Sequence, residues 1–200
     1  MDRPFLNPSA IAQALDAPGG GSSDFDLNPG FRPSPGRRLR AASVLVPLVE
    51  RGPGLRLILT RRAALLRHHP GQVAFPGGKQ DPGDPTPLAA ALREAREEIG
   101  LDDATILGEL PSHETVTGFT VTPFVGVVAP GFVPRIDRRE VDEVFEVPLD
   151  FVLDPANYRV EGRSWQGHVR HYYVVPWGPH YIWGATARML RTFADRMRAT

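Results

Sequence analysis

The chain has 200 residues, of which 42% are hydrophobic and 23% are charged, and its 23 basic residues balance 23 acidic ones. This size and composition are typical of one globular domain with a substantial buried core. The balanced charge argues against general nucleic-acid binding, and the lack of cysteine excludes disulfides, thiolate nucleophiles and cysteine-ligated zinc. The sequence has neither an N-terminal signal pattern nor an apolar run of membrane-spanning length, so we expect a cytoplasmic protein with no membrane partner.

The first 40 residues contain a short helix followed by a segment rich in glycine, proline and serine. Asn7 fits the N-cap of that helix and Pro8 its first turn. The segment 18–38 is expected to form a linker or an ordered loop over the surface. We therefore expect an N-terminal region of residues 1–40 and a main domain of residues 41–200.

Two apolar runs then predict neighbouring strands. Residues 42–49 suit a buried strand, although Pro47 favours an edge position or a bulge. Leucines alternate over residues 55–59 on the returning strand. The glycines and proline of residues 52–54 supply the turn between the two strands.

A cluster of basic residues follows the second strand: Arg61, Arg62, Arg67, His68 and His69. Such clusters commonly face solvent, and that alternative stays open. Next to a pyrophosphate site, however, guanidinium groups match phosphate in a fork geometry. Because neighbouring residues of a strand face opposite ways, the adjacent histidines are not expected to form a metal site.

Residues 87–99 carry the clearest local signal, which is a helix with an acidic face. Thr86 before a proline predicts its start, and Gly100 predicts its left-handed end. Opposite an apolar stripe lie three carboxylates at i, i+3 and i+4 spacing, those of Glu94, Glu97 and Glu98. Each pair repels by roughly a few tenths of a kcal/mol, and a hard divalent cation such as Mg²⁺ removes that conflict. A solvated acidic surface is the alternative, but the Pro-Gly-Gly turn before the helix favours a metal-assisted phosphate site.

The rest of the chain alternates strands and helices. We expect strands at 104–110 and 121–129, a charged strand edge at 140–147, a short helix at 148–153, two strands between 158 and 175, and a helix at 184–198. Mixed strands with two substantial helices predict an α/β protein, an α/β/α sandwich with a mixed β-sheet.

The acidic helix carries a resemblance to a known family. Residues 93–101, Arg-Glu-Ala-Arg-Glu-Glu-Ile-Gly-Leu, resemble the second half of the Nudix box, REUxEExGU, where U is a bulky aliphatic residue. The full box begins with Gly, five residues, Glu and seven residues. Here Gly78 is followed after five residues by Asp84 instead of Glu, and eight residues separate Asp84 from Arg93. This departure leaves the role of Asp84 open.

The run before the box resembles one subfamily of Nudix enzymes. Residues 59–78, Leu-Thr-Arg-Arg-Ala-Ala-Leu-Leu-Arg-His-His-Pro-Gly-Gln-Val-Ala-Phe-Pro-Gly-Gly, are similar to the coenzyme A diphosphatase signature LLTxRSxxLRxHxGQVxFPGG. Residues 117–126 and 182–187 are also similar to segments of that subfamily. The resemblance therefore extends from about residue 43 to the end of the chain.

This resemblance implies a fold and a reaction. It implies the Nudix fold, in which the box forms a loop–helix–loop against the sheet. It also implies metal-dependent hydrolysis of the pyrophosphate bond of coenzyme A and its derivatives to 3′,5′-ADP and 4′-phosphopantetheine, with Mg²⁺ or Mn²⁺. The 3′-phosphate of such a substrate would account for a more basic pocket. A homodimer stays possible.

The resemblance and the residue types together assign roles. Glu94, Glu97 and Glu98 are the expected metal ligands, Glu97 or Glu94 is the expected proton acceptor, and Arg93 is expected to orient a glutamate. The candidate substrate-binding residues are Arg61, Arg62, Arg67, His69, Gln72, Gly77, Gly78 and Lys79. In Nudix enzymes a further acidic residue from a distant loop often completes the metal site or acts as the base, and the candidates are Glu143, Glu140 and Glu114.

Two other functions remain open from the sequence. One is a Nudix hydrolase acting on another nucleoside diphosphate linked to a second group, such as ADP-ribose or a dinucleotide. The other is a non-catalytic Nudix-like module that senses a nucleotide. Such modules usually lose the carboxylates of the box, whereas this chain keeps all three.

Overall fold

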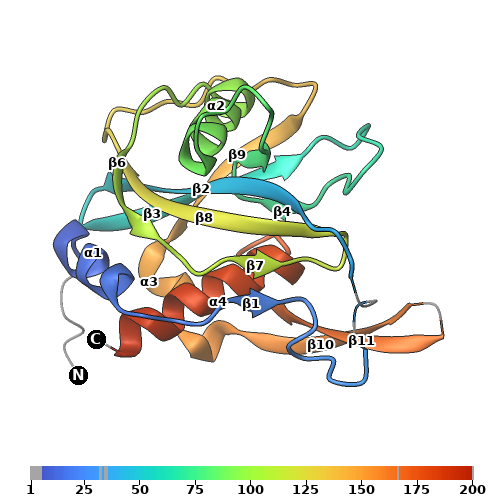
Figure 1. Cartoon of the computed structure of the whole chain (residues 1–200). Helices are drawn as coiled ribbons and strands as arrows, with labels where there is room; N and C mark the ends of the chain where they lie inside the picture. Colours follow the sequence, from blue (N-terminus) through green and yellow to red (C-terminus); the bar gives the residue numbers. More distant parts are fainter. Residues whose placement is uncertain (1–5, 32, 34–35, 166, 200) are drawn as a thin grey trace.

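The computed structural model describes residues 6–31, 33, 36–165 and 167–199, with the side chain of Trp165 left out. A mixed sheet separates two helical layers (Figure 1). One layer holds α2, Pro87–Ile99, and the other holds α1, Pro8–Asp16, α3, Leu149–Val152, and α4, Gly184–Ala199. This arrangement confirms the expected α/β/α sandwich with a mixed sheet.

Nine strands of the described chain form the sheet. They are β1 Ser22–Ser23, β2 Arg40–Arg51, β3 Gly54–Arg62, β4 Val73–Ala74, β5 Gly77–Lys79, β6 Thr105–Glu109, β7 His113–Glu114, β8 Phe119–Val128 and β9 Val141–Pro148. The order is β1-β7-β8-β2-β3-β4, and β5, β6 and β9 pair with β2, β8 and β3 respectively. After a 3-10 turn at Pro155–Asn157, β10, Arg159–Trp165, and β11, His168–Val174, form a separate antiparallel ribbon.

Strand β2 lies at the centre of the sheet, so the expectation of an edge or bulge at Pro47 was wrong. β2 pairs in parallel with β8 without interruption from Arg40 to Val49. On its other side β5 pairs only as far as Val44, and β3 begins to pair at Leu48. Because Pro47 lies between these two partners, its missing N–H removes no ladder hydrogen bond there.

The N-terminal helix begins as its capping residues predict. The Asn7 side chain accepts a hydrogen bond from the amide of Ala10 at 2.9 Å. Ile11 and Leu15 on the buried face of α1 belong to the same hydrophobic cluster as α4. Residues 1–5 of the expected N-terminal region lie outside the described residues, and its division from the main domain at residue 40 stays a prediction.

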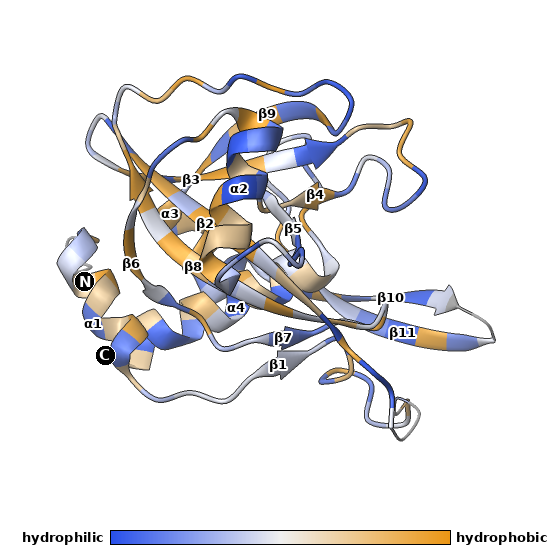
Figure 2. Cartoon of the chain, turned by 45° about the horizontal axis from the view of Figure 1, so that its top comes forward, coloured by the Kyte–Doolittle hydropathy of each residue, from blue (hydrophilic) through white to orange (hydrophobic). Residues whose placement is uncertain are grey.

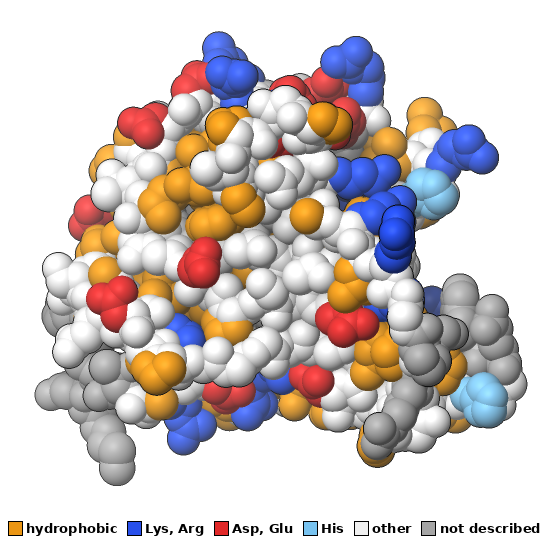
Figure 3. Space-filling view, in the orientation of Figure 1, with side chains coloured by type: hydrophobic (Ala, Val, Ile, Leu, Met, Phe, Trp, Pro, Cys, Tyr) orange, Lys and Arg blue, Asp and Glu red, His pale blue; other side chains and the backbone are white. Residues whose placement is uncertain are grey.

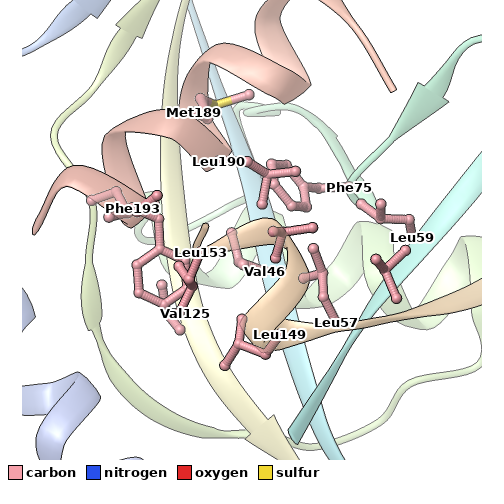
Figure 4. Packing of buried hydrophobic residues seen from close by; sticks show 14 of the residues in the cluster. Val46, Leu57, Leu59, Phe75, Val125, Leu149, Leu153, Met189, Leu190 and Phe193 are labelled. Atoms are coloured by element: carbon pink, nitrogen blue, oxygen red, sulfur yellow. The ribbon is translucent and has the colours of Figure 1, made fainter. Parts of the chain in front are cut away.

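Two hydrophobic clusters hold the layers together. On the α4 side, strand residues pack against the helix, as Figure 4 shows for Val46, Leu57, Phe75, Leu190 and Phe193. On the α2 side the packed residues include Leu45, Ile58, Ala91, Ala95 and Ile99. Burial of each large apolar side chain contributes about 1.5–3 kcal/mol. Figure 2 shows the resulting pattern, with hydrophobic strands between the layers and a hydrophilic outer face on α2.

No helix among the described residues is long and apolar enough to cross a membrane.

Candidate active site

Helix α2 positions the acidic residues, and its ends form as the sequence predicts. The hydroxyl of Thr86 accepts a hydrogen bond from the amide of Ala89 at 3.1 Å, and Gly100 ends the helix with φ of 68°. Small residues on the buried face, Ala91 and Ala95, let the helix lie close to β2. Its outer face lies at the upper rim in Figure 3, where acidic side chains gather beside basic ones.

Three carboxylates converge beside this helix. Glu94, Glu98 and Glu140 each offer an oxygen within 4.8 Å of the others, and we call them the carboxylate cluster. Glu98 is buried, with 4% of its surface exposed, whereas Glu94 is half-buried and Glu140 is exposed. Glu94 and Glu98 were expected as ligands, and Glu140 was the second of three candidates for an additional acidic residue.

The electrostatics of the cluster are unbalanced. Burial raises the pKa of the Glu98 carboxyl to about 8, although a hydrogen bond from the amide of Gly77 opposes this. Burial also raises the pKa of Glu94, against the attraction of Arg93. Convergent carboxylate oxygens, two of them on side chains whose charged form is disfavoured by burial, form a donor set that a hard divalent cation neutralises. The residues present therefore fit such a cation.

Two glycines of β5 lie directly against the cluster. The Gly77 amide donates to Oε2 of Glu98 at 3.2 Å. A Cβ atom on Gly78 would lie 2.6 Å from the carboxylate of Glu94, and one on Gly77 would lie 2.5 Å from the carbonyl oxygen of Ser43. Both positions therefore need glycine for the close approach of β5 to α2 and β2.

Arg93 links the box residues to one another. Its Nε and Nη2 donate to the two oxygens of Asp84, both at 3.0 Å, and its Nη1 donates to Glu94 at 3.0 Å. The hydrogen bonds from Arg93 lower the pKa of Asp84, whose side chain is only 7% exposed. Asp84, whose role the sequence left open, therefore orients Arg93, and Arg93 in turn contacts Glu94.

Glu97 lies outside the carboxylate cluster. Its side chain is 54% exposed, and Oε2 accepts a hydrogen bond from Nη1 of Arg93 at 3.0 Å, one helical turn away. Of the three expected ligands, the structure thus brings together Glu94 and Glu98 and leaves Glu97 beside them.

The other acidic candidates lie elsewhere. Glu143 on β9 pairs with Arg61 at 3.0 Å. Glu114 lies on β7, which β8 and β2 separate from β3, and it pairs with Arg37 at 3.0 Å. Arg37 also donates to the backbone of residues 115–116, so it fastens the N-terminal segment to this strand.

The basic candidates on β3, on the following loop and on β5 differ in depth. The charge of Arg62, at the end of β3, lowers the pKa of Glu98 and so opposes the effect of burial. Nε of Arg62 is buried without a hydrogen-bond partner among the described residues. Arg67 and His69 are exposed on the loop between β3 and β4, and Gln72 is half-buried at its end. Lys79 is exposed, and its carbonyl oxygen accepts from Arg93 at 3.2 Å.

Residues 37–166 match the family described as NUDIX domain. A relative from Enterobacter sp. (strain 638), named Uncharacterized Nudix hydrolase NudL, is 45% identical over 159 residues, which cover 78% of this chain and 81% of the relative. A protein of the same name from Klebsiella pneumoniae (strain 342) is 44% identical over 84% of this chain and 90% of its own length.

A solved structure gives the same fold class. The crystal structure of the MutT protein from Methanosarcina mazei Go1 has a TM-score of 0.53 and 21% identity, covering 83% of this chain and 98% of that one. This likeness concerns the fold, whereas the family match and the relatives rest on sequence. The chain belongs to the Nudix hydrolase family.

Proposed function

We propose that this Nudix protein hydrolyses the pyrophosphate bond of coenzyme A, giving 3′,5′-ADP and 4′-phosphopantetheine. One observation carries the proposal. The run that is similar to the coenzyme A signature, residues 59–78, ends at the two glycines that lie against Glu94 and Glu98. The residues of the signature and the residues of the box therefore meet at one place, as a shared substrate site requires.

The carboxylate cluster would hold the Mg²⁺ or Mn²⁺. When bound, such an ion would neutralise charge on the diphosphate and lower the pKa of an attacking water. The Gly77 amide fixes the orientation of Glu98, and Arg93 fixes that of Glu94. Glu97 lies beside the cluster with half of its side chain exposed, so it is our candidate for accepting the proton of the water.

Basic side chains would bind the phosphates of the substrate. The buried Nε of Arg62, which has no hydrogen-bond partner in the described part of the chain, lies in the surroundings of Glu98. Arg67 and Lys79 are exposed on the segments that flank the two glycines. Guanidinium and ammonium groups in these positions suit the multiple negative charges of coenzyme A.

Mass spectrometry of the products tests the proposal. Purified protein is incubated with Mg²⁺ and with coenzyme A, ADP-ribose or a dinucleoside polyphosphate in separate reactions. We expect 3′,5′-ADP and 4′-phosphopantetheine from coenzyme A and slower cleavage of the others. Faster cleavage of ADP-ribose or a dinucleotide would reassign the substrate, and binding without products would indicate a sensor.

A pair of variants ties the reaction to the cluster. Glu98→Gln should abolish turnover because it removes a buried ligand charge, whereas Glu109→Gln, at an exposed position on β6, should leave it unchanged. A sensor that needs no metal would lose little affinity for its nucleotide in Glu98→Gln.

A further inference from the structure

Glu143 holds two basic side chains at the edge of the sheet. Its Oε2 accepts a hydrogen bond from Nε of Arg61 at 3.0 Å, and its Oε1 lies 3.6 Å from Nε2 of His180. Arg61 and Glu143 are register partners on β3 and β9. Because side chains alternate along a strand, Glu143 shares the α4 side of the sheet with Phe145 and Val147. It therefore stands apart from the α2 side, where Glu94 and Glu98 lie.

His180 is fixed from two directions. Its ring stacks on Phe145 with 3.6 Å between the ring centroids and 6° between the planes. Its backbone exchanges two hydrogen bonds with Trp177, both of 2.9 Å, across a tight turn in which Gly178 has φ of 55°. Only 12% of the side chain is exposed. Glu143 therefore faces a rigid neighbour on one side and Arg61 on the other.

This geometry leaves part of Arg61 available. The contact with Glu143 uses Nε, and among the described residues the terminal nitrogens of Arg61 make no hydrogen bond. The side chain is 43% exposed. A guanidinium that is held at Nε and free at its end presents two donors in a fixed direction, which suits a phosphate group.

We propose that Glu143 is a positioning residue that aims Arg61 at a substrate phosphate outside the diphosphate, and that His180 holds Glu143 in place. The inference rests on the proposed function, under which that group is the 3′-phosphate of coenzyme A. It gives Glu143 a role in specificity instead of metal binding or proton transfer, and it adds His180, which lies just before the subfamily-like segment 182–187.

Steady-state kinetics of Glu143→Ala test the inference. The KM for coenzyme A should rise about tenfold, as expected when a charged hydrogen-bond partner loses its orientation, while kcat stays within about twofold. The KM for 3′-dephospho-coenzyme A should not change. Arg61→Ala should show the same pattern, and the double variant should be no worse than either single one. Glu143→Gln, which keeps an acceptor oxygen, should rescue part of the loss.

Glu146 supplies the matched control on the same strand. It pairs with Arg51 at 3.0 Å and with Arg56 at 3.3 Å, farther along β9 from Arg61. Glu146→Ala therefore breaks ion pairs of the same kind and should leave both KM values unchanged. Thermal unfolding of each variant shows that it is folded before its kinetics are compared.

Three results would overturn the inference. A large fall in kcat with unchanged KM would make Glu143 the proton acceptor, and weaker Mn²⁺ binding to the substrate-free variant would make it a ligand. Equal changes for the two substrates would make the ion pair merely structural. If the wild type cleaves no coenzyme A, the proposed function fails, and calorimetry still decides the inference: Glu143→Ala should weaken binding of 3′,5′-ADP and not of AMP.

Discussion

Two polar regions of this molecule both contain acidic side chains, but they differ in how those side chains are paired. The carboxylate cluster brings acidic side chains together with too little positive charge to balance them. At the other end of the sheet, His113 is fully buried, with its Nδ1 2.9 Å from the hydroxyl of Ser22 and its Nε2 3.2 Å from Asp24. Asp24 also accepts the amide of Val116 at 2.8 Å. We call Ser22, Asp24 and His113 the His113 cluster.

The first region is the proposed catalytic site, whereas the second joins β1 to β7. Serine, histidine and aspartate are the residues of a hydrolytic triad, yet here Ser22 is 6% exposed and His113 is inaccessible, so no substrate reaches them. Each of their polar groups already has a partner, whereas burial raises the pKa of Glu98 to about 8, so its charged form has too few partners near neutral pH unless a cation binds. Unbalanced charge is therefore a better sign of function here than the types of residue.

The largest expected effect comes from removing that charge. Glu98→Gln should lower kcat by about a thousandfold, because it removes an expected ligand of the catalytic ion. Without divalent ions, the same change should raise the free energy of unfolding, because a neutral amide costs less to bury than a carboxylate. Urea unfolding with EDTA measures the second effect. If Glu98→Gln lowers both stability and activity, the Glu98 carboxylate is already stabilised by its protein neighbours without a metal ion.

The His113 cluster should respond in the opposite way. His113→Ala leaves the half-buried Asp24 without its main partner and removes a fully buried ring, and should cost about 3–5 kcal/mol of unfolding free energy. The activity of the molecules that remain folded should hardly change. His168→Ala, on the exposed ribbon, is the control. If the variant is stable and inactive, this cluster belongs to the active site after all.

The two regions should also give opposite dependences on pH. The pKa of Glu98 rises from an ordinary 4.5 to about 8 on folding, so its contribution to stability is complete below pH 4.5 and is lost as pH rises toward 8. Burial would raise the pKa of Asp24, but His113 and the Val116 amide hold it below its ordinary 3.8, so its contribution is lost as pH falls below that value.

Unfolding with EDTA at a series of pH values checks both signs. We expect the wild type to lose up to a few kcal/mol between about pH 5 and 8. Glu98→Gln should remove that loss, and Asp24→Asn should reduce the loss on the acid side. Addition of Mg²⁺ should protect the wild type at pH 8. A stability that rises steadily to pH 8 without metal would contradict the assignment.

The sequence predicted what depends on local geometry. The caps of α2 and the common side of Glu94 and Glu98 follow from four-residue spacing on a helix. The same spacing explains Glu97, because Arg93 precedes it by four residues and competes for its carboxylate. Spacing alone did not show whether Glu97 would pair with Arg93 or join Glu94 and Glu98 at a metal site.

The rest depends on contacts between distant segments. Glu140 reaches the cluster because the loop before β9 is fastened to α2 by the amide of Asp137, which donates to the carbonyl of Glu98 at 3.0 Å. Ser22 meets His113 across 91 residues through the pairing of β1 with β7. Contacts between residues so far apart in the sequence leave no periodic pattern. The sequence therefore offered Glu140 only as one of three candidates, and it did not indicate His180 or the His113 cluster.

The smallest effect we predict concerns the link between Asp84 and Arg93. Arg93→Lys keeps the charge but cannot make the two parallel hydrogen bonds to Asp84 while also contacting Glu94. We expect kcat to fall about tenfold, equivalent to about 1.4 kcal/mol, with little change in KM. Asp84→Asn should cause a similar loss, and the double variant should lose little more, because both act through the orientation of Glu94. Fully additive losses would mean that Asp84 and Arg93 act independently, and that the aspartate at this irregular box position does not do the work of orienting the arginine.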